Sequence, residues 1–439
     1  MNYIKMNKIK KPPIWFPTLL QSANTINIKS NSWFNIKQIT NPEPTEISLK
    51  QDIINTNFIK TKKYIIYPND IQKNILHKWF HGVINMYNIT NNYIKNKYDI
   101  TKKIDSFFTV RKLLDSDAKN IIGETQTPKH ILDYSMKHCI EMYKSSIRNL
   151  RNGNIKNFEI SNLQHTRNRF NIVLEPNNFS KNMNGFYVSK LGEMKYDRNL
   201  NNLNNLNNLI KKNSILQYNK NNDKYYLIVP SDTNFKTSLL KDELCGIDLG
   251  VRTFATVYSP NEVIEIGTNL IPTIDLYHKR KDQLKSFLDK RYISYEKYNK
   301  VIYKYGSNIR NKIDDLHKKV SVFLTKKFKT INIGKISTSS IVSNNKSNKS
   351  NTSDKTKRRL LTLSLYKFLE RLKITGNKYD CNINFLSEYK TSMTCNNCHN
   401  EDKNLGSNKT YKCLKCNLVI DRDINSSIIF YKGGYDNLI

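Results

Sequence analysis

Four cysteines near the C-terminus form two Cys-x-x-Cys pairs, Cys395 with Cys398 and Cys413 with Cys416, and fourteen residues separate the pairs. A Zn²⁺ ion takes four ligands at tetrahedral corners, and two such turns on facing hairpins can supply four thiolates without a large core. Four unrelated buried cysteines would not be expected to repeat this spacing. The pattern therefore predicts a structural zinc ribbon over residues 395–416.

Three aspartates offer a second kind of chemistry. Asp248 lies in a predicted strand between Ile247 and Leu249, and Asp421 and Asp423 follow the last cysteine within seven residues. An aspartate between apolar strand residues is costly to bury unless it caps, pairs or binds a metal. Two-metal phosphodiester hydrolysis requires clustered carboxylates, because Mg²⁺ is a hard cation that takes oxygen ligands. For Asp421 and Asp423 the alternative is capping of a C-terminal helix, and only one of them needs to face a site.

The elements around these residues predict an α/β domain. Two adjoining strands turn at Gly250, a long basic helical stretch breaks near Gly306, and strands then alternate with helices. This order places helices against a sheet, with a carboxylate available at the end of several strands. A Ser, Asn and Lys-rich segment at 343–357 predicts a mobile loop. The predicted strands are 244–250, 253–258, 331–336 and 381–389, and the predicted helices are 275–328, 360–374 and 424–431.

The first 240 residues predict two further parts. Residues 1–61 have little apolar periodicity and contain five prolines, which predicts a poorly ordered or peripheral arm. Residues 62–240 predict a β-rich, barrel-like module with a helical insert at about 70–165. Leu-Asn-Asn repeats at 200–209 predict a low-complexity insertion in a loop. The best strand candidates of this module are 170–174, 185–191 and 225–229.

The overall composition indicates a polyanionic partner. The 439 residues contain 72 Lys and Arg against 37 Asp and Glu, a formal net charge of +35. A compact protein with this excess repels itself unless a polyanion neutralises it, so nucleic acid is expected, ahead of an anionic membrane or no partner at all. We find neither a run of 18 apolar residues nor a signal-peptide core. The other cysteines, Cys139, Cys245 and Cys381, have no recognisable spacing, which favours a reducing, intracellular location.

Three motifs together resemble a known nuclease family. Residues 246–252 read Gly-Ile-Asp-Leu-Gly-Val-Arg, residues 391–398 read Thr-Ser-Met-Thr before the first cysteine pair, and residues 413–425 join the second pair to Asp-Arg-Asp-Ile-Asn. They are similar to the split RuvC-like nuclease domain of TnpB proteins and of their eukaryotic and viral relatives, the Fanzors. The resemblance covers about 244–431. Upstream, only a few residues, such as Gln72 and Trp79, fit the family.

This resemblance implies both a fold and a function. The fold is a RuvC/RNase H-like domain at 241–394 and 417–439, with the zinc ribbon at 395–416 inserted in it. The function is that of an RNA-guided DNA endonuclease from a transposon-derived gene, in which a guide RNA selects the target DNA beside a short DNA motif. Type V CRISPR nucleases are similar, and they hold the guide–target duplex by its backbone. A monomeric protein in a ribonucleoprotein is expected, in the nucleus of a eukaryotic or virus-infected host and otherwise in the cytoplasm.

One position departs from the usual pattern of this family. Most bacterial members carry the middle catalytic Glu at the end of the strand that here ends with Gly334. Glu388 lies at the end of the next predicted strand, where Fanzors similarly carry a displaced Glu. The resemblance therefore implies that Asp248, Glu388 and Asp423 hold two Mg²⁺ ions. The alternative to a metal ligand is that Glu388 is an exposed residue at the end of a strand. In a second departure from the family pattern, Lys390 replaces a Tyr that is usual in the family.

Two other functions are compatible with these motifs. A nucleic-acid-binding regulator without nuclease activity would keep the fold, and a guide-independent RuvC-like transposase or resolvase would keep the site as well. Sequencing of copurifying RNA tests for a guide, since a single defined species favours guided cleavage. A Glu388→Ala protein that behaves as the parent does would favour the regulator. Because Glu388 and Asp423 bracket the zinc ribbon, its loss is expected to harm catalysis as well as local folding.

Overall fold

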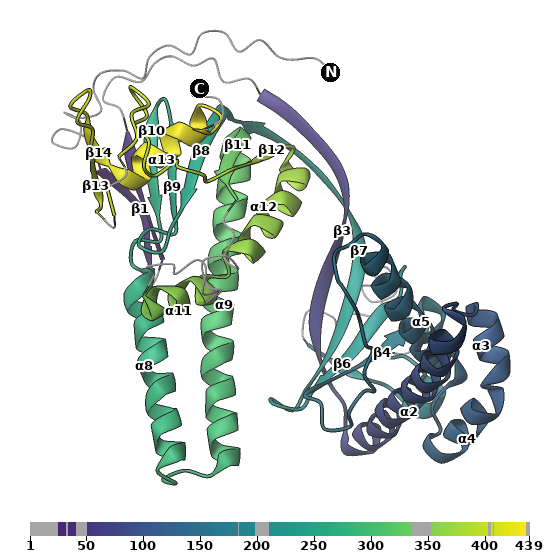
Figure 1. The fold of residues 1–439 in the computed structure, drawn as a ribbon. Coiled ribbons are helices and arrows are strands. Elements are labelled where there is room, and N and C mark those ends of the chain that lie inside the picture. Colours follow the sequence, from purple (N-terminus) through teal and green to yellow (C-terminus); the bar gives the residue numbers. More distant parts are fainter. Residues whose placement is uncertain are drawn as a thin grey trace. The chain divides into compact units, whose positions relative to one another are not determined.

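The computed structural model describes residues 25–31, 34–40, 51–182, 184–197, 210–335, 353–402, 405–406 and 408–435 (Figure 1). The chain divides into two compact units, which are described here one at a time. One unit combines Met1–Asn57 with Asn234–Ile439, and the other is Phe58–Thr233. The insertion expected at 200–209 and most of the loop expected at 343–357 lie outside the described residues.

The first unit is built on a seven-stranded sheet. Its described strands, in spatial order, are β1 (Thr25–Asn31), β2 (Phe34–Thr40), β10 (Glu262–Ile266), β9 (Ala255–Ser259), β8 (Asp242–Leu249), β11 (Phe328–Gly334) and β12 (Asn382–Leu386). β8, β9 and β10 form an antiparallel meander, whereas β11 is parallel to both β8 and β12. A meander continued by two parallel strands is the RuvC/RNase H-like arrangement, so the predicted fold class is confirmed.

Two strands from the N-terminal segment extend this sheet at one edge. β1 and β2 pair antiparallel with each other, and β2 pairs antiparallel with β10, where Ile39 lies opposite Val263. Both strands fall in the segment for which the sequence predicts a poorly ordered or peripheral arm. β2 pairs with β10, which is more than 200 residues away in sequence, and a local pattern carries no signal of such a partner.

Helices cover both faces of the sheet. The helices of this unit are α8 (Leu270–Asp289), α9 (Tyr295–Lys327), α11 (Asp354–Leu363), α12 (Leu365–Tyr379) and α13 (Arg422–Tyr431). On β8, Cys245, Ile247 and Leu249 are buried in a core shared with α9 and α12. Side chains alternate along a strand, so Gly246 and Asp248 face the other side, where α13 packs against Gly246.

The long basic stretch is a helical hairpin, and the predicted break at Gly306 is wrong. α8 ends at Asp289 and α9 begins at Tyr295, whereas Gly306 is buried inside α9. The break is made by Arg291, whose φ of 59° is left-handed, and by the Ser294 side chain, which accepts a hydrogen bond from the Lys297 backbone N–H. Similarly, the helix predicted at 360–374 is two helices, because Ser364 has a φ of 50°.

The second unit packs helices on an antiparallel sheet. Its strands, in spatial order, are β4 (Arg169–Leu174), β6 (Ser214–Asn219), β7 (Lys224–Leu240), β3 (Gln51–Tyr67) and β5 (Lys195–Tyr196). Its main helices are α2 (Asp70–Thr101), α3 (Phe107–Leu113), α4 (Asp115–Thr125) and α5 (Lys129–Arg151). These helices lie between β3 and β4 in sequence. Trp79 and Phe80 of α2 are fully buried against the sheet residues Phe170 and Leu216.

One predicted strand of this unit is wrong. Residues 185–191 contain an isolated bridge at Phe186 and a short helix, α6 (Val188–Leu191). Gly185 has a φ of 159° and Tyr187 a φ of 47°, so the backbone turns where a strand would continue.

None of the described helices is both long and apolar enough to cross a bilayer.

Candidate active site and metal centre

Four thiols meet in the C-terminal part of the first unit. The Sγ atoms of Cys395 and Cys416 lie 3.6 Å apart, those of Cys398 and Cys413 lie 3.4 Å apart, and all four lie within 4.8 Å of one another. Thiolates at tetrahedral corners about 2.3 Å from Zn²⁺ would be about 3.8 Å apart, so this donor set fits a structural zinc ion. The structure thus brings together the four residues that the spacing predicts as zinc ligands.

Two matching turns position these thiols. The backbone N–H of His399 donates to the carbonyl of Cys395 at 3.0 Å, and that of Asn417 donates to the carbonyl of Cys413 at 2.9 Å. His399 and Asn417 have φ angles of 60° and 57°, a left-handed conformation that His and Asn adopt more readily than most residues. A short hairpin of β13 (Thr410–Lys412) and β14 (Val419–Asp421) then leads the chain into α13.

Asn425 ties this zinc ribbon to α13. Its side-chain oxygen accepts hydrogen bonds from the backbone N–H of Asn396 at 3.0 Å and from the Asn396 side chain at 2.8 Å. Its side-chain amide donates to the carbonyl of Thr394 at 2.7 Å. Asn425 is completely buried, so these bonds fix the first cysteine turn against the helix that carries Asp423.

Close packing at Gly246 brings α13 onto β8. A Cβ atom at this position would lie 2.1 Å from the carbonyl oxygen of Ser427 and 2.2 Å from the backbone nitrogen of Tyr431. Only glycine permits this approach, because the obstructing atoms belong to the backbone of a packed helix. Since Gly246 and Asp248 face the same side of β8, the contact sets the distance between α13 and Asp248.

The two aspartates at the start of α13 have different roles. Asp421 is the N-cap, and its Oδ1 accepts hydrogen bonds from the backbone N–H groups of Asp423 at 2.8 Å and Ile424 at 3.4 Å. Asp423 lies in the first turn with its side chain only 14% exposed, and Oδ1 is 3.6 Å from Nε of Arg422. The geometry therefore assigns capping to Asp421 and leaves Asp423 free of that role, near enough for its charge to raise the pKa of Asp248.

Glu388 follows β12 and reaches over the end of β11. A Cβ atom at Gly334 would lie 2.7 Å from Oε1 of Glu388 and 2.9 Å from its Cγ. The turn is held by Thr391, whose backbone N–H and hydroxyl both donate to the carbonyl of Glu388, at 3.3 and 3.1 Å. Glu388 is therefore partly buried rather than an exposed strand-end residue.

Burial disfavours the ionised form of all three carboxylates, and neighbouring charge does so for Asp248 and Asp423. Burial raises the pKa of Asp248 well above its usual range, and the charges of Asp423 and Glu388 raise it further. Burial also raises the pKa of Glu388 to about 7 and, together with Asp421, raises the pKa of Asp423. Buried carboxylate oxygens of this kind suit a hard divalent cation such as Mg²⁺.

This carboxylate set is more open than the zinc cluster. Among the described residues, the four cysteines are the one group of His, Cys, Asp or Glu whose ligand atoms all lie within 4.8 Å. Asp248, Glu388 and Asp423 do not form a group this tight.

Some residues that position this site carry only a weak signal in the sequence. Asn332 of β11 donates from its side chain to the carbonyl of Phe430 in α13 at 3.0 Å, and it accepts from the Asn384 side chain of β12 at 2.9 Å. Polar Asn332 between Ile331 and Ile333 is the one hint of this contact in the sequence. Gly246 and Asn425 lie inside recognised motifs, but their spacing does not reveal what they contact.

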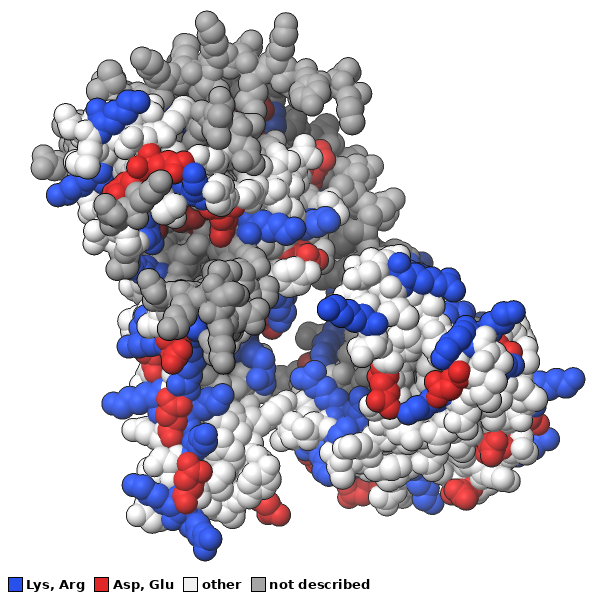
Figure 2. All heavy atoms as spheres, in the orientation of Figure 1, with Lys and Arg blue, Asp and Glu red and all other residues white. Residues whose placement is uncertain are grey.

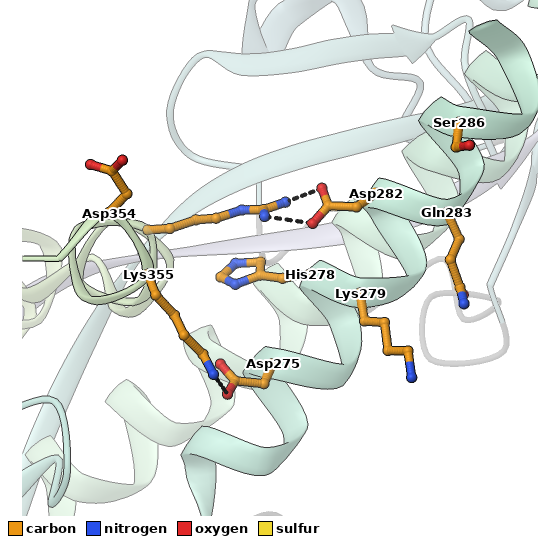
Figure 3. Close-up of a pocket in the computed structure, with 9 residues that line it drawn as sticks. Asp275, His278, Lys279, Asp282, Gln283, Ser286, Asp354 and Lys355 are labelled. Atoms are coloured by element: carbon orange, nitrogen blue, oxygen red, sulfur yellow. Dashed lines mark hydrogen bonds and ion pairs between the residues drawn. The ribbon is translucent and has the colours of Figure 1, made fainter.

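A separate cavity of about 750 Å³ lies between α8 and α11 (Figure 3). Two of its three acidic side chains are engaged in ion pairs: Arg358 binds Asp282 through two bonds of 2.6 and 2.7 Å, and Lys355 lies 3.2 Å from Asp275. These bonds lower the pKa of Asp282, and Arg359 and Lys355 hold the pKa of Asp275 at about 2. Ion pairs between α8 and α11 therefore border the cavity, and the third acidic residue of its lining, Asp354, is exposed.

Comparison with known proteins places these motifs among transposon-related sequences. Residues 236–345 match a family model described as "Probable transposase", and residues 366–430 match one described as "Cas12f1-like, TNB domain". Two proteins of Acanthamoeba polyphaga mimivirus, TnpB-like protein L770 and TnpB-like protein R854, are each 34% identical over 477 aligned positions. These alignments cover 98% of this chain and 87% and 86% of the viral proteins.

Two solved structures are similar at lower identity. A Cas12f1–sgRNA–target DNA complex aligns with 85% of this chain and 99% of its own at 16% identity, with a TM-score of 0.30. The mini-RNA-guided endonuclease CRISPR-Cas_phi3 aligns with 85% of this chain and 92% of its own at 10% identity, with a TM-score of 0.35.

Proposed function

Because the chain belongs to the TnpB-like family, we propose that it is an RNA-guided DNA endonuclease that hydrolyses phosphodiester bonds at Asp248, Glu388 and Asp423. The observation that carries this proposal is the convergence of the three carboxylates. They come from β8, from the turn after β12 and from α13, and the pKa of Asp248 is raised by both of the others. Three acids that gather at one edge of a RuvC/RNase H-like sheet support a metal-dependent nuclease.

In this proposal the carboxylates hold two Mg²⁺ ions. Bound there, the ions would activate the attacking water and neutralise charge on the departing 3′ oxygen. The protein contributes rigid placement: Gly246 fixes α13 against β8, and Asn425 fixes the zinc ribbon against α13. The charges of Arg422 and Arg252 offset part of the rise in the pKa of Asp423, so they keep positive charge beside the site where a phosphate would lie.

The net charge of +35 supports a nucleic-acid partner. In the TnpB-type design that we propose, a guide RNA selects the DNA by base pairing, and the protein holds the hybrid by its backbone. The two similar solved structures are a Cas12f1–sgRNA–target DNA complex and a mini-RNA-guided endonuclease.

One purification tests the guide and the site together. The full chain would be expressed with its flanking DNA, the copurifying RNA sequenced, and Mg²⁺-dependent cleavage measured on a plasmid that matches that RNA. We expect one defined RNA, cleavage by the parent, and loss of cleavage with retained DNA binding in Asp248→Ala and Glu388→Ala. Unchanged cleavage in either variant would refute the site. Cleavage without a defined RNA would favour a guide-independent transposase or resolvase, and guided binding without cleavage would favour a regulator.

A further inference from the structure

The outer part of the α8–α9 hairpin is unusually basic. Residues 279–304 contain nine Lys and Arg against three Asp and Glu, a net charge of +6 in 26 residues, whereas the whole chain carries +35 over 439. All nine basic side chains are exposed, and Figure 2 shows basic side chains along the hairpin and at its end. The basic residues are Lys279, Arg280, Lys281, Lys285, Lys290, Arg291, Lys297, Lys300 and Lys304.

Acidic residues of the hairpin itself neutralise little of this charge. Asp282, one of the three acidic residues, is engaged by Arg358 of α11 through two bonds of 2.6 and 2.7 Å. That leaves Asp289 and Glu296 to offset the nine cations. The braces to α11 hold the base of the hairpin, and its turn lies at the end remote from α13 (Figure 1). The end of the hairpin therefore presents a concentrated positive charge that a polyanion would neutralise.

The turn itself is built to a defined geometry. The backbone N–H of Arg291 donates to Leu288 at 2.9 Å, and that of Tyr292 donates to Phe287 at 2.8 Å. With Arg291 left-handed, this is a Schellman motif, and the 6.3 Å contact between the rings of Phe287 and Tyr292 is its usual hydrophobic pair. The tip is thus an ordered turn and not a loose loop.

Aromatic rings at this tip are exposed beyond what the turn needs. Tyr292 is 72% exposed, Tyr295 is 68% exposed and Phe287 is 46% exposed. The Schellman contact explains why Phe287 and Tyr292 are near each other, but it gives no reason for Tyr295 or for so much ring surface in water. Exposed rings beside Lys and Arg are the combination that binds unpaired nucleotides, in which rings stack on bases and cations contact phosphates.

We propose that the hairpin tip, residues 285–297, binds unpaired nucleotides of the guide RNA. Tyr292 and Tyr295 stack on bases, and Lys285, Lys290 and Lys297 contact the adjoining phosphates. Unpaired loops and bulges are a permanent feature of folded RNA, whereas the bases of duplex DNA are already stacked on one another. The choice of RNA over single-stranded DNA rests on the proposed function, but binding at the tip does not depend on cleavage.

Binding of a defined probe to the full-length chain tests this proposal. The protein would be freed of copurifying nucleic acid in high salt and titrated with a fluorescent 12-nucleotide oligouridine. We expect Tyr292→Ser/Tyr295→Ser to bind about tenfold more weakly for each ring lost, while Tyr292→Phe/Tyr295→Phe keeps the parent affinity. Tyr366→Ser, which removes a ring that is 64% exposed on α12, is the matched control and should bind as the parent does.

The salt dependence gives a second readout. Lys290→Ser/Lys297→Ser should lower the slope of log affinity against log salt by about 1.4, as expected for two lost phosphate contacts to a single strand. Equal oligouridine binding by the parent and the Tyr→Ser pair would overturn the proposal. Tighter binding of an oligothymidine of the same length would overturn the assignment to RNA. A protein that binds oligouridine as expected but cuts no DNA would support nucleotide binding at the hairpin tip and refute the proposed nuclease activity.

Discussion

The carboxylate of Glu388 occupies the space in front of Gly334, where a Cβ atom would lie 2.7 Å from Oε1. Gly334 pairs in register with Leu386 on the parallel strand β12, so Glu388 is only two residues beyond this pair and can reach back over the end of β11. A Glu on β11 and a Glu after β12 would therefore bring a carboxylate to the same place. Each arrangement excludes the other, which accounts for a glycine at 334 together with a Glu at 388.

Moving the carboxylate between the two strands tests this equivalence. Glu388→Ala should reduce the single-turnover cleavage rate roughly 1000-fold, since several kcal/mol of transition-state stabilisation depend on the metal site. Glu388→Ala combined with Gly334→Glu should recover at least about tenfold of that loss, because the new side chain enters the space that Glu388 vacates. The ring of Phe430, whose Cζ would lie 2.7 Å from the new Cβ, must rotate slightly to admit it.

Target binding by the same complexes is the control, and it should be unchanged in both variants. A double variant that cuts no faster than Glu388→Ala would show that the two positions do not serve one site.

Adding one methyl group at Gly246 should separate α13 from β8. The group would lie 2.1 and 2.2 Å from backbone atoms of Ser427 and Tyr431, which cannot move without shifting the helix. We expect Gly246→Ala to lower the free energy of unfolding by about 3 kcal/mol and to abolish cleavage, because Asp423 moves with α13. Urea unfolding and cleavage of the matched target measure the two effects.

Gly123→Ala is the matched control for this substitution. Gly123 is exposed on α4, and a Cβ there would meet no atom within 4 Å. Alanine should stabilise that helix by up to about 1 kcal/mol and leave cleavage unchanged. A Gly246→Ala protein that is as stable and as active as Gly123→Ala would show that close packing at β8 is not required.

The sequence predicts those parts of the structure in which the chemistry of a site requires particular residue types at a fixed spacing along the chain. Each Cys-x-x-Cys turn is a local structure, so the meeting of Cys395 and Cys416 at 3.6 Å follows from the pattern of residue types. Asp248 stands out because an acid between two apolar strand residues needs a reason. The family resemblance added Glu388, which the pattern of residues alone leaves open to an exposed position.

What the sequence does not predict depends on contacts between distant residues. Gly306 looks like a helix breaker, yet it is buried inside α9, where the tertiary packing of a 33-residue helix overrides the intrinsic cost of one glycine. Arg291 ends the preceding helix in a left-handed conformation, but arginine is not a residue type that predicts a helix end. The partners of Asn425 lie about 30 residues away, so its motif marks it as notable without saying what it holds.

His317 should make the stability of the protein depend on pH. It is completely buried in α9, where Nε2 donates to the carbonyl of Leu363 at 3.0 Å, and burial lowers its pKa to about 4. The folded protein therefore binds this proton less readily than the unfolded chain, in which the pKa is about 6.5. The stabilisation is complete above about pH 6.5, and up to about 3 kcal/mol of it is lost as the pH falls towards 4.

His317→Gln isolates this effect, because Gln can keep the hydrogen bond to Leu363 but does not titrate. Urea unfolding of both proteins between pH 4 and pH 8 gives a difference curve in which other titrating groups cancel. We expect the parent to lose stability relative to the variant as the pH falls below 6.5. A flat difference curve would mean that His317 is not held neutral by burial.

Loss of zinc should stop cleavage even though all three carboxylates remain. Cys395→Ala removes one of four ligands, and the first cysteine turn is the part that Asn425 holds against α13. We expect it to lose most of its zinc and all measurable cleavage.

Asn425→Ala should keep its zinc, because the four thiols are untouched, but it leaves the buried amide groups of Asn396 without their acceptor. That should cost about 2 kcal/mol of stability and slow cleavage 10- to 100-fold. Zinc content by elemental analysis, urea unfolding and single-turnover cleavage distinguish the two variants. A fully active Cys395→Ala protein would instead make the zinc ribbon a separate module, with no part in positioning Asp423.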